Sequence, residues 1–136
     1  QHFTAAEIAR LTQQLHSGSP TGLDYYPLPA RGERFPVNDP DLEPVLAPRP
    51  PEDARFFQGI LEGIARIEVQ GYRRLAELGA PWPDRVISTG GGAVNHAWRT
   101  IRSQLLGIPV DIAVHQEAAY GSALLALRGA ANLAQD

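Results

Sequence analysis

Apolar side chains recur every three or four positions between residues 52 and 79. This spacing places them on one face of a helix. The stripe consists of Phe57, Ile60, Leu61, Ile64, Ile67, Leu75 and Leu78. Pro51 suits the first turn of such a helix, and Gly79 suits the position after its end. A helix of this length would span roughly 40 Å. This is long for a small domain, so we expect the helix to pack against a larger surface.

Two different segments precede this helix. Residues 1–16 carry a shorter apolar stripe, and Thr4 with Glu7 matches a capping box, so a helix is predicted there. Residues 17–51 contain most of the twelve prolines, which exclude a regular helix or a central strand. Apolar and aromatic residues are scattered through the same proline-rich segment. It is therefore predicted to be an ordered loop that runs over a larger body.

Residues 85–128 are predicted to form a βαβα unit. Val86 and Ile87 indicate a first strand, and alternating apolar residues over 109–114 indicate a second. A helical stripe lies between them, and a last helix over 118–127 is rich in small residues, so close packing is expected there. Strands joined through a helix form a parallel pair with a right-handed crossover. Because parallel sheets are buried on both faces, we expect further strands in a longer parent chain.

Three consecutive glycines, Gly90 to Gly92, follow the first predicted strand. Backbone amides at such a strand-to-helix connection favour an anion, and ligands of open parallel sheets lie at the C-terminal ends of strands. Glycine admits a ligand close to the backbone, but it also permits a tight turn that binds nothing. The local sequence leaves both alternatives open. Position 95 is Asn where a G-x-G-x-x-G fingerprint needs glycine, and no Lys is present for a Walker-type loop.

The composition narrows the possible partners. A net charge of −3 without a basic excess argues against nucleic-acid binding. The chain has no cysteine, which excludes disulfides and thiol chemistry, and the four histidines show no metal-ligand spacing. No apolar run reaches the length of a membrane span and no signal peptide is visible, so the cytoplasm is the expected compartment. The chain begins at Gln1 within a pattern, and we expect it to be a piece of a longer protein.

Several motifs occur together in the order found in one enzyme family. The segment STGGGAVNHAWRTIRSQLLGIPV holds a Gly-Gly-Gly-Ala loop (Gly90 to Ala93), an aromatic residue five positions later (Trp98) and a Leu-Gly-x-Pro-Val turn (Leu106 to Val110). HQEAAYGSALLAL then supplies Glu-Ala-x-x-Gly-x-Ala (Glu117 to Ala123). Together these motifs resemble the nucleotide-binding C-terminal domain of the FGGY carbohydrate kinases.

Upstream motifs resemble one branch of that family. GERFPVNDP (Gly32 to Pro40) is similar to the Gly-Glu-Arg-x-Pro loop of xylulokinase-like members. LDYYPL (Leu23 to Leu28) and ILEGIARIEVQGY (Ile60 to Tyr72) look most like the D-ribulose and D-xylulose kinases of plants and bacteria. The resemblance covers residues 23–128.

This resemblance implies a fold and a nucleotide site. Residues 1–136 would be an α/β protein, the C-terminal part of a ribonuclease H-like lobe of an actin-like ATPase. Asn95 is the candidate for a polar contact with adenosine, with His96 as the alternative because some relatives carry the asparagine one position later. Mg²⁺ would arrive with the nucleotide. The residues that would lie against the phosphates and ribose of ATP or ADP are Gly90, Gly91, Gly92 and Ala93.

The resemblance also implies a reaction. The parent enzyme would transfer a phosphoryl group from MgATP to a primary hydroxyl of a ketopentose, either D-ribulose or D-xylulose. The catalytic aspartate and a phosphate-binding hairpin would lie upstream, beside a missing N-terminal lobe, so this piece holds no catalytic residue and would be inactive alone. The resemblance leaves a homodimer open.

A second interpretation belongs to a different class of protein. If the glycines form only a turn, the chain would be a non-catalytic interaction or regulatory α/β domain, with exposed apolar surface and a tendency to self-associate. In either case Glu33 and Arg34 are expected to brace their own loop, and Trp98 is expected to lie in the core.

Overall fold

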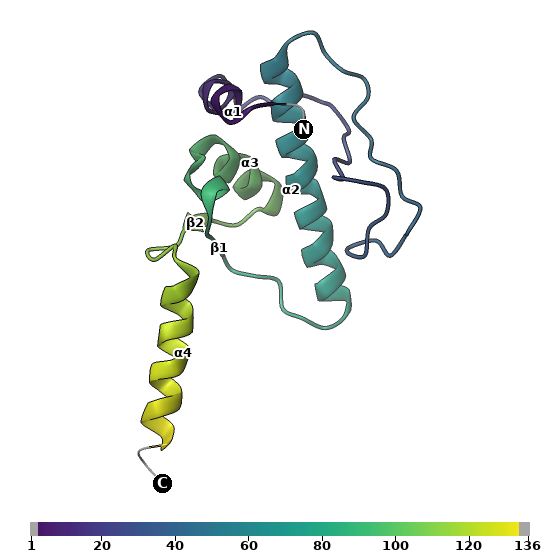
Figure 1. Cartoon of the computed structure of the whole chain (residues 1–136). Coiled ribbons are helices and arrows are strands. Elements are labelled where there is room, and N and C mark those ends of the chain that lie inside the picture. The colour runs from purple at the N-terminus through teal and green to yellow at the C-terminus, as the bar shows by residue number, and fades with distance from the viewer. Residues whose placement is uncertain (1–2, 134–136) are drawn as a thin grey trace.

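The computed structural model describes residues 3–133. Helix α1 (Ala5–Thr12) is followed by a long irregular segment (residues 13–52) and by helix α2 (Asp53–Glu77) (Figure 1). The remaining elements, in chain order, are strand β1 (Val86–Ser88), a short 3₁₀ helix (Gly91–Val94), helix α3 (His96–Leu106), strand β2 (Val110–Ile112) and helix α4 (Ala118–Leu133). Each helix and strand expected from the sequence therefore has a counterpart, although α4 ends six residues beyond its expected end at 127.

The capping box at the start of α1 is present. The Thr4 hydroxyl accepts a hydrogen bond from the Glu7 amide at 3.3 Å, and the Glu7 carboxylate accepts one from the Thr4 amide at 2.7 Å. These bonds satisfy amide groups that have no partner within the helix. They fix Thr4 as the residue that caps the start of α1.

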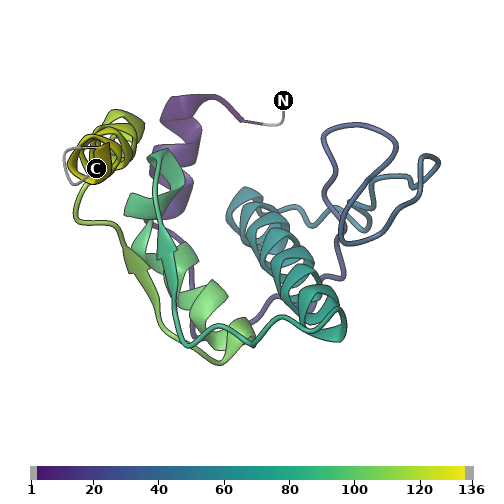
Figure 2. The ribbon, with the colours of Figure 1, turned by 90° about the horizontal axis from the view of Figure 1, so that it is seen from below.

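Helix α2 separates two sides of the molecule (Figure 2). Helices α1 and α3 and the sheet lie on one side, and the irregular segment lies on the other. Three buried clusters join these parts. Leu11, Phe57 and Leu61 lie between α1 and α2, and Leu23, Tyr25 and Phe56 lie between the irregular segment and α2. The cluster between the sheet, α2 and α3 consists of Val69, Val86, Leu106 and Val110. Phe56 and Phe57 are adjacent, so neighbouring parts of the surface of α2 hold the two sides, and Phe3 packs edge-on against both rings.

The two strands form a parallel pair, as the sequence predicts. Val86 lies opposite Val110 and Ser88 lies opposite Ile112. Val86 and Val110 are buried against α2 and α3, whereas Ile87 is exposed on the other face. Within residues 3–133 the sheet has only these two strands. The glycine loop therefore starts at the C-terminal end of β1.

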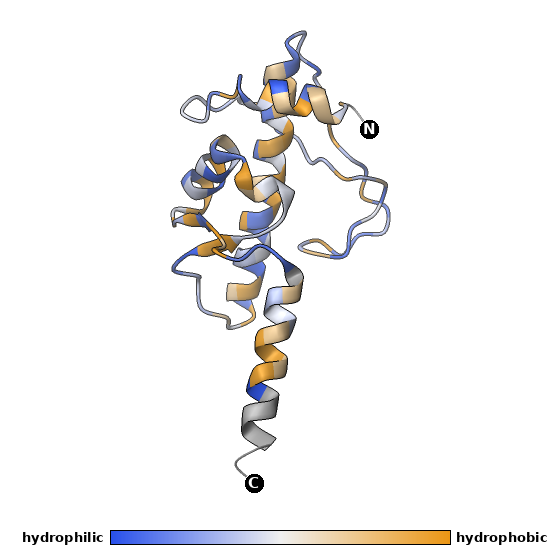
Figure 3. Cartoon of the chain, turned by 60° about the vertical axis from the view of Figure 1, so that its left-hand side comes forward, coloured by the Kyte–Doolittle hydropathy of each residue, from blue (hydrophilic) through white to orange (hydrophobic). Residues whose placement is uncertain are grey.

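Helix α4 extends away from the rest of the chain (Figures 1 and 3). Its side chains from residue 119 to 128 are all exposed, including Leu125 and Leu127. The expectation of close packing for this helix is therefore wrong for the described residues. Small residues permit close approach only where a partner surface exists, and residues 3–133 provide none against α4. No helix in that range has the length and apolar content that a bilayer-spanning segment needs.

The irregular segment is held by specific contacts. Tyr26 and Val45 exchange two backbone hydrogen bonds of 2.9 Å, and Glu33 pairs in the same way with Asp39. The phenol of Tyr26 donates to the Glu33 carboxylate, and that of Tyr25 donates to the Pro48 carbonyl. Glu33 therefore braces its own loop, in agreement with the expectation from the sequence. The same expectation is wrong for Arg34, whose exposed side chain makes no hydrogen bond or ion pair to residues 3–133.

Two glycines of α2 let this segment lie directly on the helix. A Cβ atom at Gly59 would lie 2.9 Å from side-chain atoms of Leu23 and Tyr25. At Gly63 it would lie 2.7 Å from the carbonyl oxygen of Tyr25 and 2.8 Å from Pro27. Neither distance leaves room for a methyl group, so the helix needs glycine at both positions.

We expect the chain to lose stability above a pH of about 10. Burial raises the pKa of Tyr25, and burial together with the hydrogen bond to Glu33 raises the pKa of Tyr26, both from the ordinary value of 10.0. An acid whose pKa is raised by folding stabilises the native state below its unfolded pKa, and that contribution is lost as the pH rises toward the folded pKa. The chain has neither Lys nor Cys, so few other side chains titrate in this range.

Urea unfolding at about pH 8 and about pH 11 tests this dependence. The free energy of unfolding should fall between the two pH values, and it should fall less in Tyr26→Phe, which cannot ionise at that position. Tyr120→Phe is the control, because Tyr120 is exposed on α4. A drop of the same size in Tyr26→Phe and in the parent chain would contradict the expectation.

Candidate functional site

The glycine loop connects β1 to α3. Ser88 is the last residue of β1, and the chain turns through Thr89 and Gly90 into the 3₁₀ helix before α3 begins at His96. Two hydrogen bonds close the turn, from the Ala93 amide to the Gly90 carbonyl at 3.0 Å and from the Asn95 amide to the Gly92 carbonyl at 3.1 Å. The loop is thus a defined turn at the position where parallel sheets place their ligands.

Two of the three glycines are required by the fold, each for a different reason. Gly90 has a φ of 82°, in the left-handed region that other residues rarely adopt. At Gly92 a Cβ atom would lie 2.6 Å from the indole ring of Trp98. Gly91 has neither constraint: its φ lies outside that region and a Cβ there would meet no heavy atom within 4 Å. The space above Gly91 is open to a group from outside the chain.

The loop also offers unused hydrogen-bond donors. Gly90, Gly91 and Gly92 are exposed, and no acceptor within residues 3–133 receives the amide hydrogen of Gly91 or Gly92. Exposed, neighbouring amides of this kind suit the oxygens of an anion. The open space at Gly91 and these donors occur at the same place.

The other predicted site residues differ in how they are used. The Asn95 side chain accepts a hydrogen bond from the Trp98 amide at 3.0 Å, which caps α3, and it donates to the Thr12 hydroxyl at 3.4 Å. It is therefore engaged within the fold, whereas His96 beside it is exposed. The methyl group of Ala93 is buried, so Ala93 can meet a ligand only through its backbone.

Two arginines of α3 bond to the two ends of the loop. Arg102 donates to the Ser88 hydroxyl at the end of β1, and Arg99 donates to the Ala93 carbonyl in the 3₁₀ helix. Arg102 also makes two hydrogen bonds of 2.7 Å to Glu68 on α2. The sequence analysis missed these residues. Their only signal is the three-residue spacing of the two arginines, which puts both on one face of α3.

A cavity of about 530 Å³ lies behind the loop. It is bounded by α2, β1 and α3, and its lining includes Ser88, Gly92 and Trp98. The indole nitrogen of Trp98 is buried, and no acceptor in the described part of the chain receives its hydrogen. Trp98 is thus partly buried, as expected, and it faces a volume that residues 3–133 do not fill.

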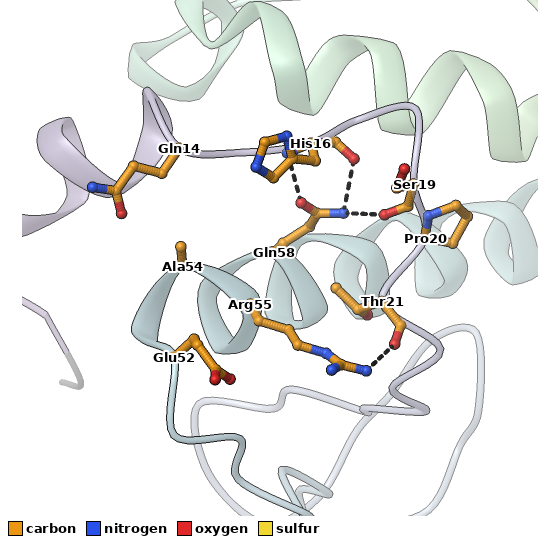
Figure 4. Close-up of a pocket in the computed structure, with 9 residues that line it drawn as sticks. All are labelled: Gln14, His16, Ser19, Pro20, Thr21, Glu52, Ala54, Arg55 and Gln58. Carbon is orange, nitrogen blue, oxygen red and sulfur yellow. Dashed lines mark hydrogen bonds between the residues drawn. The ribbon is translucent and has the colours of Figure 1, made fainter.

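A second cavity, of about 720 Å³, lies near the start of α2 (Figure 4). The side-chain amide of Gln58 makes three hydrogen bonds beside this cavity. It accepts from the His16 amide at 2.9 Å and donates to the carbonyls of His16 and Ser19. Arg55 donates to the Thr21 carbonyl at 3.0 Å. These groups hold residues 16–21 on α2, so this cavity belongs to a structural junction.

No metal-binding cluster accompanies either cavity. Among residues 3–133, no group of three or more histidine, aspartate, glutamate or cysteine side chains is placed to hold a metal ion.

The comparison with known families agrees with this geometry. Residues 4–130 match the FGGY family of carbohydrate kinases, C-terminal domain. The match includes all the elements that build the glycine loop, together with the irregular segment and α2. It favours the kinase interpretation over a non-catalytic interaction domain. This chain belongs to the FGGY family of carbohydrate kinases, of which it carries the C-terminal domain.

Proposed function

We propose that this chain is the nucleotide-binding C-terminal part of an ATP-dependent kinase that phosphorylates a ketopentose, D-ribulose or D-xylulose. Membership of the FGGY family supports the class of reaction. The parallel strand pair and the loop at its C-terminal end support a ribonuclease H-like lobe of an actin-like ATPase. Neither observation depends on the identity of the sugar.

The observation that carries the proposal is the open position at Gly91. Backbone conformation explains glycine at position 90, and contact with Trp98 explains it at position 92. Nothing within residues 3–133 explains it at position 91, where the neighbouring amides also lack acceptors. A phosphate or ribose oxygen at this place would supply the acceptors and would need the space that a side chain would take.

The residues of this chain would bind and orient the nucleotide. MgATP supplies the phosphoryl group that is transferred, and such transfers depend mainly on positioning and charge stabilisation. The amides of Gly91 and Gly92 would donate to the nucleotide, and the exposed His96 or the Asn95 amide would contact the adenosine. No step of the chemistry is assigned to a side chain of this chain.

The ketopentose rests on the upstream motifs. The loop GERFPVNDP (Gly32 to Pro40), which resembles xylulokinase-like members, is ordered by the Glu33–Asp39 pairing and by the bond from Tyr26 to Glu33. Arg34 is exposed within this loop and has no ion-pair partner among the described residues. An ordered loop with an exposed arginine supports a role for this segment beyond connecting α1 to α2.

We expect Gly91→Ala to weaken the binding of MgADP by about tenfold while leaving the fold intact. A Cβ at this position meets nothing within 4 Å in the free chain, and replacing glycine with alanine outside the left-handed region is neutral or stabilising by up to about 1 kcal/mol. Only a ligand in contact with the backbone would be displaced. Chemical-shift titration of the amides with MgADP gives the affinity, and urea unfolding gives the stability.

The parent chain should show shifts centred on residues 90–95. Gly18→Ala is the matched control, because Gly18 also has open space around it and lies in a different loop. It should bind MgADP with the affinity of the parent chain. Shifts confined to other surfaces, or equal affinities in Gly91→Ala and the parent chain, would reject the glycine loop as a nucleotide site.

A further inference from the structure

The glycine loop is bonded at both ends by the arginine pair (Arg99 and Arg102). Arg102 reaches the end of β1 through the Ser88 hydroxyl, and Arg99 reaches the far side of the loop through the Ala93 carbonyl. Both arginines come from α3, and they are three residues apart on one face of that helix. One rigid element therefore contacts the loop before and after its glycines.

Arg102 is itself held rigidly. Its guanidinium makes two parallel hydrogen bonds to the Glu68 carboxylate, both of 2.7 Å, and it lies 5.2 Å from the centre of the Trp98 ring. The side chains of Arg102 and Glu68 are only 10% and 22% exposed. A two-pronged, largely buried ion pair of this kind has a defined geometry. It links α2, α3 and β1 directly beneath the loop.

Apart from the two hydrogen bonds that close the turn, the residues between the two anchors have few contacts within residues 3–133. Gly90 and Gly91 are exposed, and a Cβ at either would meet no atom within 4 Å. Glycine also has more conformational freedom to lose than any other residue. Without fixed ends, this part of the chain would sample many conformations, and a ligand would have to order it on binding.

We propose that the arginine pair positions the glycine loop for the nucleotide, with Glu68 holding Arg102 in place. This inference rests on the proposed nucleotide-binding function. Each of the three guanidinium nitrogens of Arg102 donates to Glu68 or Ser88, so Arg102 acts through the loop and is a positioning residue. By ordering the loop in advance, the pair lowers the entropy that the nucleotide must otherwise remove.

Three variants of the chain separate this role from a general effect on folding. Ser88→Ala removes the hydroxyl that Arg102 contacts and leaves the Arg102–Glu68 ion pair intact. Arg102→Met removes the ion pair as well, and Arg102→Lys keeps the charge without the two-pronged geometry. Arg74→Met is the matched control, because Arg74 forms an exposed ion pair with Glu77 at the far end of α2.

The first readout is the order of the loop in the free protein. We expect ¹⁵N order parameters at Gly90 and Gly91 near about 0.8 in the parent chain and in Arg74→Met, and below about 0.6 in Ser88→Ala and Arg102→Met. Arg102→Lys should give intermediate values. A role limited to global stability would lower the unfolding midpoint without loosening these two residues in the native state. Order parameters that stay at the parent values in both Ser88→Ala and Arg102→Met overturn the proposal.

The second readout is MgADP affinity, measured for the folded fraction of each variant. It should fall about threefold to tenfold in Ser88→Ala, because the nucleotide must then order loop backbone that the hydroxyl contact no longer fixes. A loop that loosens while MgADP affinity stays unchanged also overturns the proposal. If the parent chain shows no MgADP shifts at the loop, the proposed nucleotide site fails, whereas the order parameters still decide whether the arginine pair fixes the loop.

Discussion

Replacing Phe56 with alanine is expected to lower the free energy of unfolding by about 4 kcal/mol. The ring is only 2% exposed and lies edge-on to Tyr25 and Phe3, with centroid distances of 5.7 and 6.2 Å. The guanidinium of Arg49 stacks on the ring at 4.0 Å. Removing it leaves a cavity between α2 and the irregular segment, where the ring packs with Leu23 and Tyr25. Urea unfolding followed by circular dichroism measures the change.

Leu78→Ala serves as the control for this substitution. Leu78 follows α2 directly and is 71% exposed, so its truncation should change the free energy of unfolding by less than about 0.5 kcal/mol. If Phe56→Ala cost no more than Leu78→Ala, the irregular segment would not be packed on α2 as the structure has it.

The second large effect is expected for Gly63→Ala. A methyl group there would collide with the carbonyl oxygen of Tyr25 at 2.7 Å and with the ring of Pro27 at 2.8 Å. Both belong to the backbone or to a fixed ring, so neither can turn aside. Overpacking of this kind costs about 3 kcal/mol, and the higher helix propensity of alanine returns about 1 kcal/mol. The net loss is therefore about 2 kcal/mol, again measured by urea unfolding.

Gly121→Ala makes the same chemical change in an open environment. Gly121 lies within α4, and a Cβ there meets nothing within 4 Å. The substitution should leave the unfolding midpoint unchanged or raise it slightly, since alanine favours the helix. Two variants with equal midpoints would show that the contact between Gly63 and the irregular segment is not formed in solution.

Much of the secondary structure could be predicted from local patterns. The apolar stripe and the flanking Pro51 and Gly79 placed α2 within two residues of its observed ends. The β-branched runs around Val86 and Val110 predicted the parallel pair, which the structure has. Local patterns could not predict whether α4 packs against another surface. Small residues allow a close approach to the helix, but they do not show that a partner surface is present.

The glycine loop could also be located from the sequence, but the reason for each glycine could not. Only the structure shows that Gly92 faces Trp98 and that Gly91 faces open space. The arginine pair was missed for a related reason. Arg102 meets Glu68 across 34 residues of sequence, and such a contact depends on how α2 and α3 pack.

The irregular segment has a consequence for how proteases would act on this protein. It lacks regular secondary structure, yet its arginines are held in place in the native state: Arg31 is paired with Asp41 at 2.7 Å, Arg34 is exposed but lies in the loop that the Glu33–Asp39 pairing closes, and Arg49 stacks on Phe56 and precedes a proline. A protease needs several residues of detached, extended chain. Detaching this segment would expose Tyr25 and Phe56, so cleavage here would follow the opening of the hydrophobic core and not the motion of a loose loop.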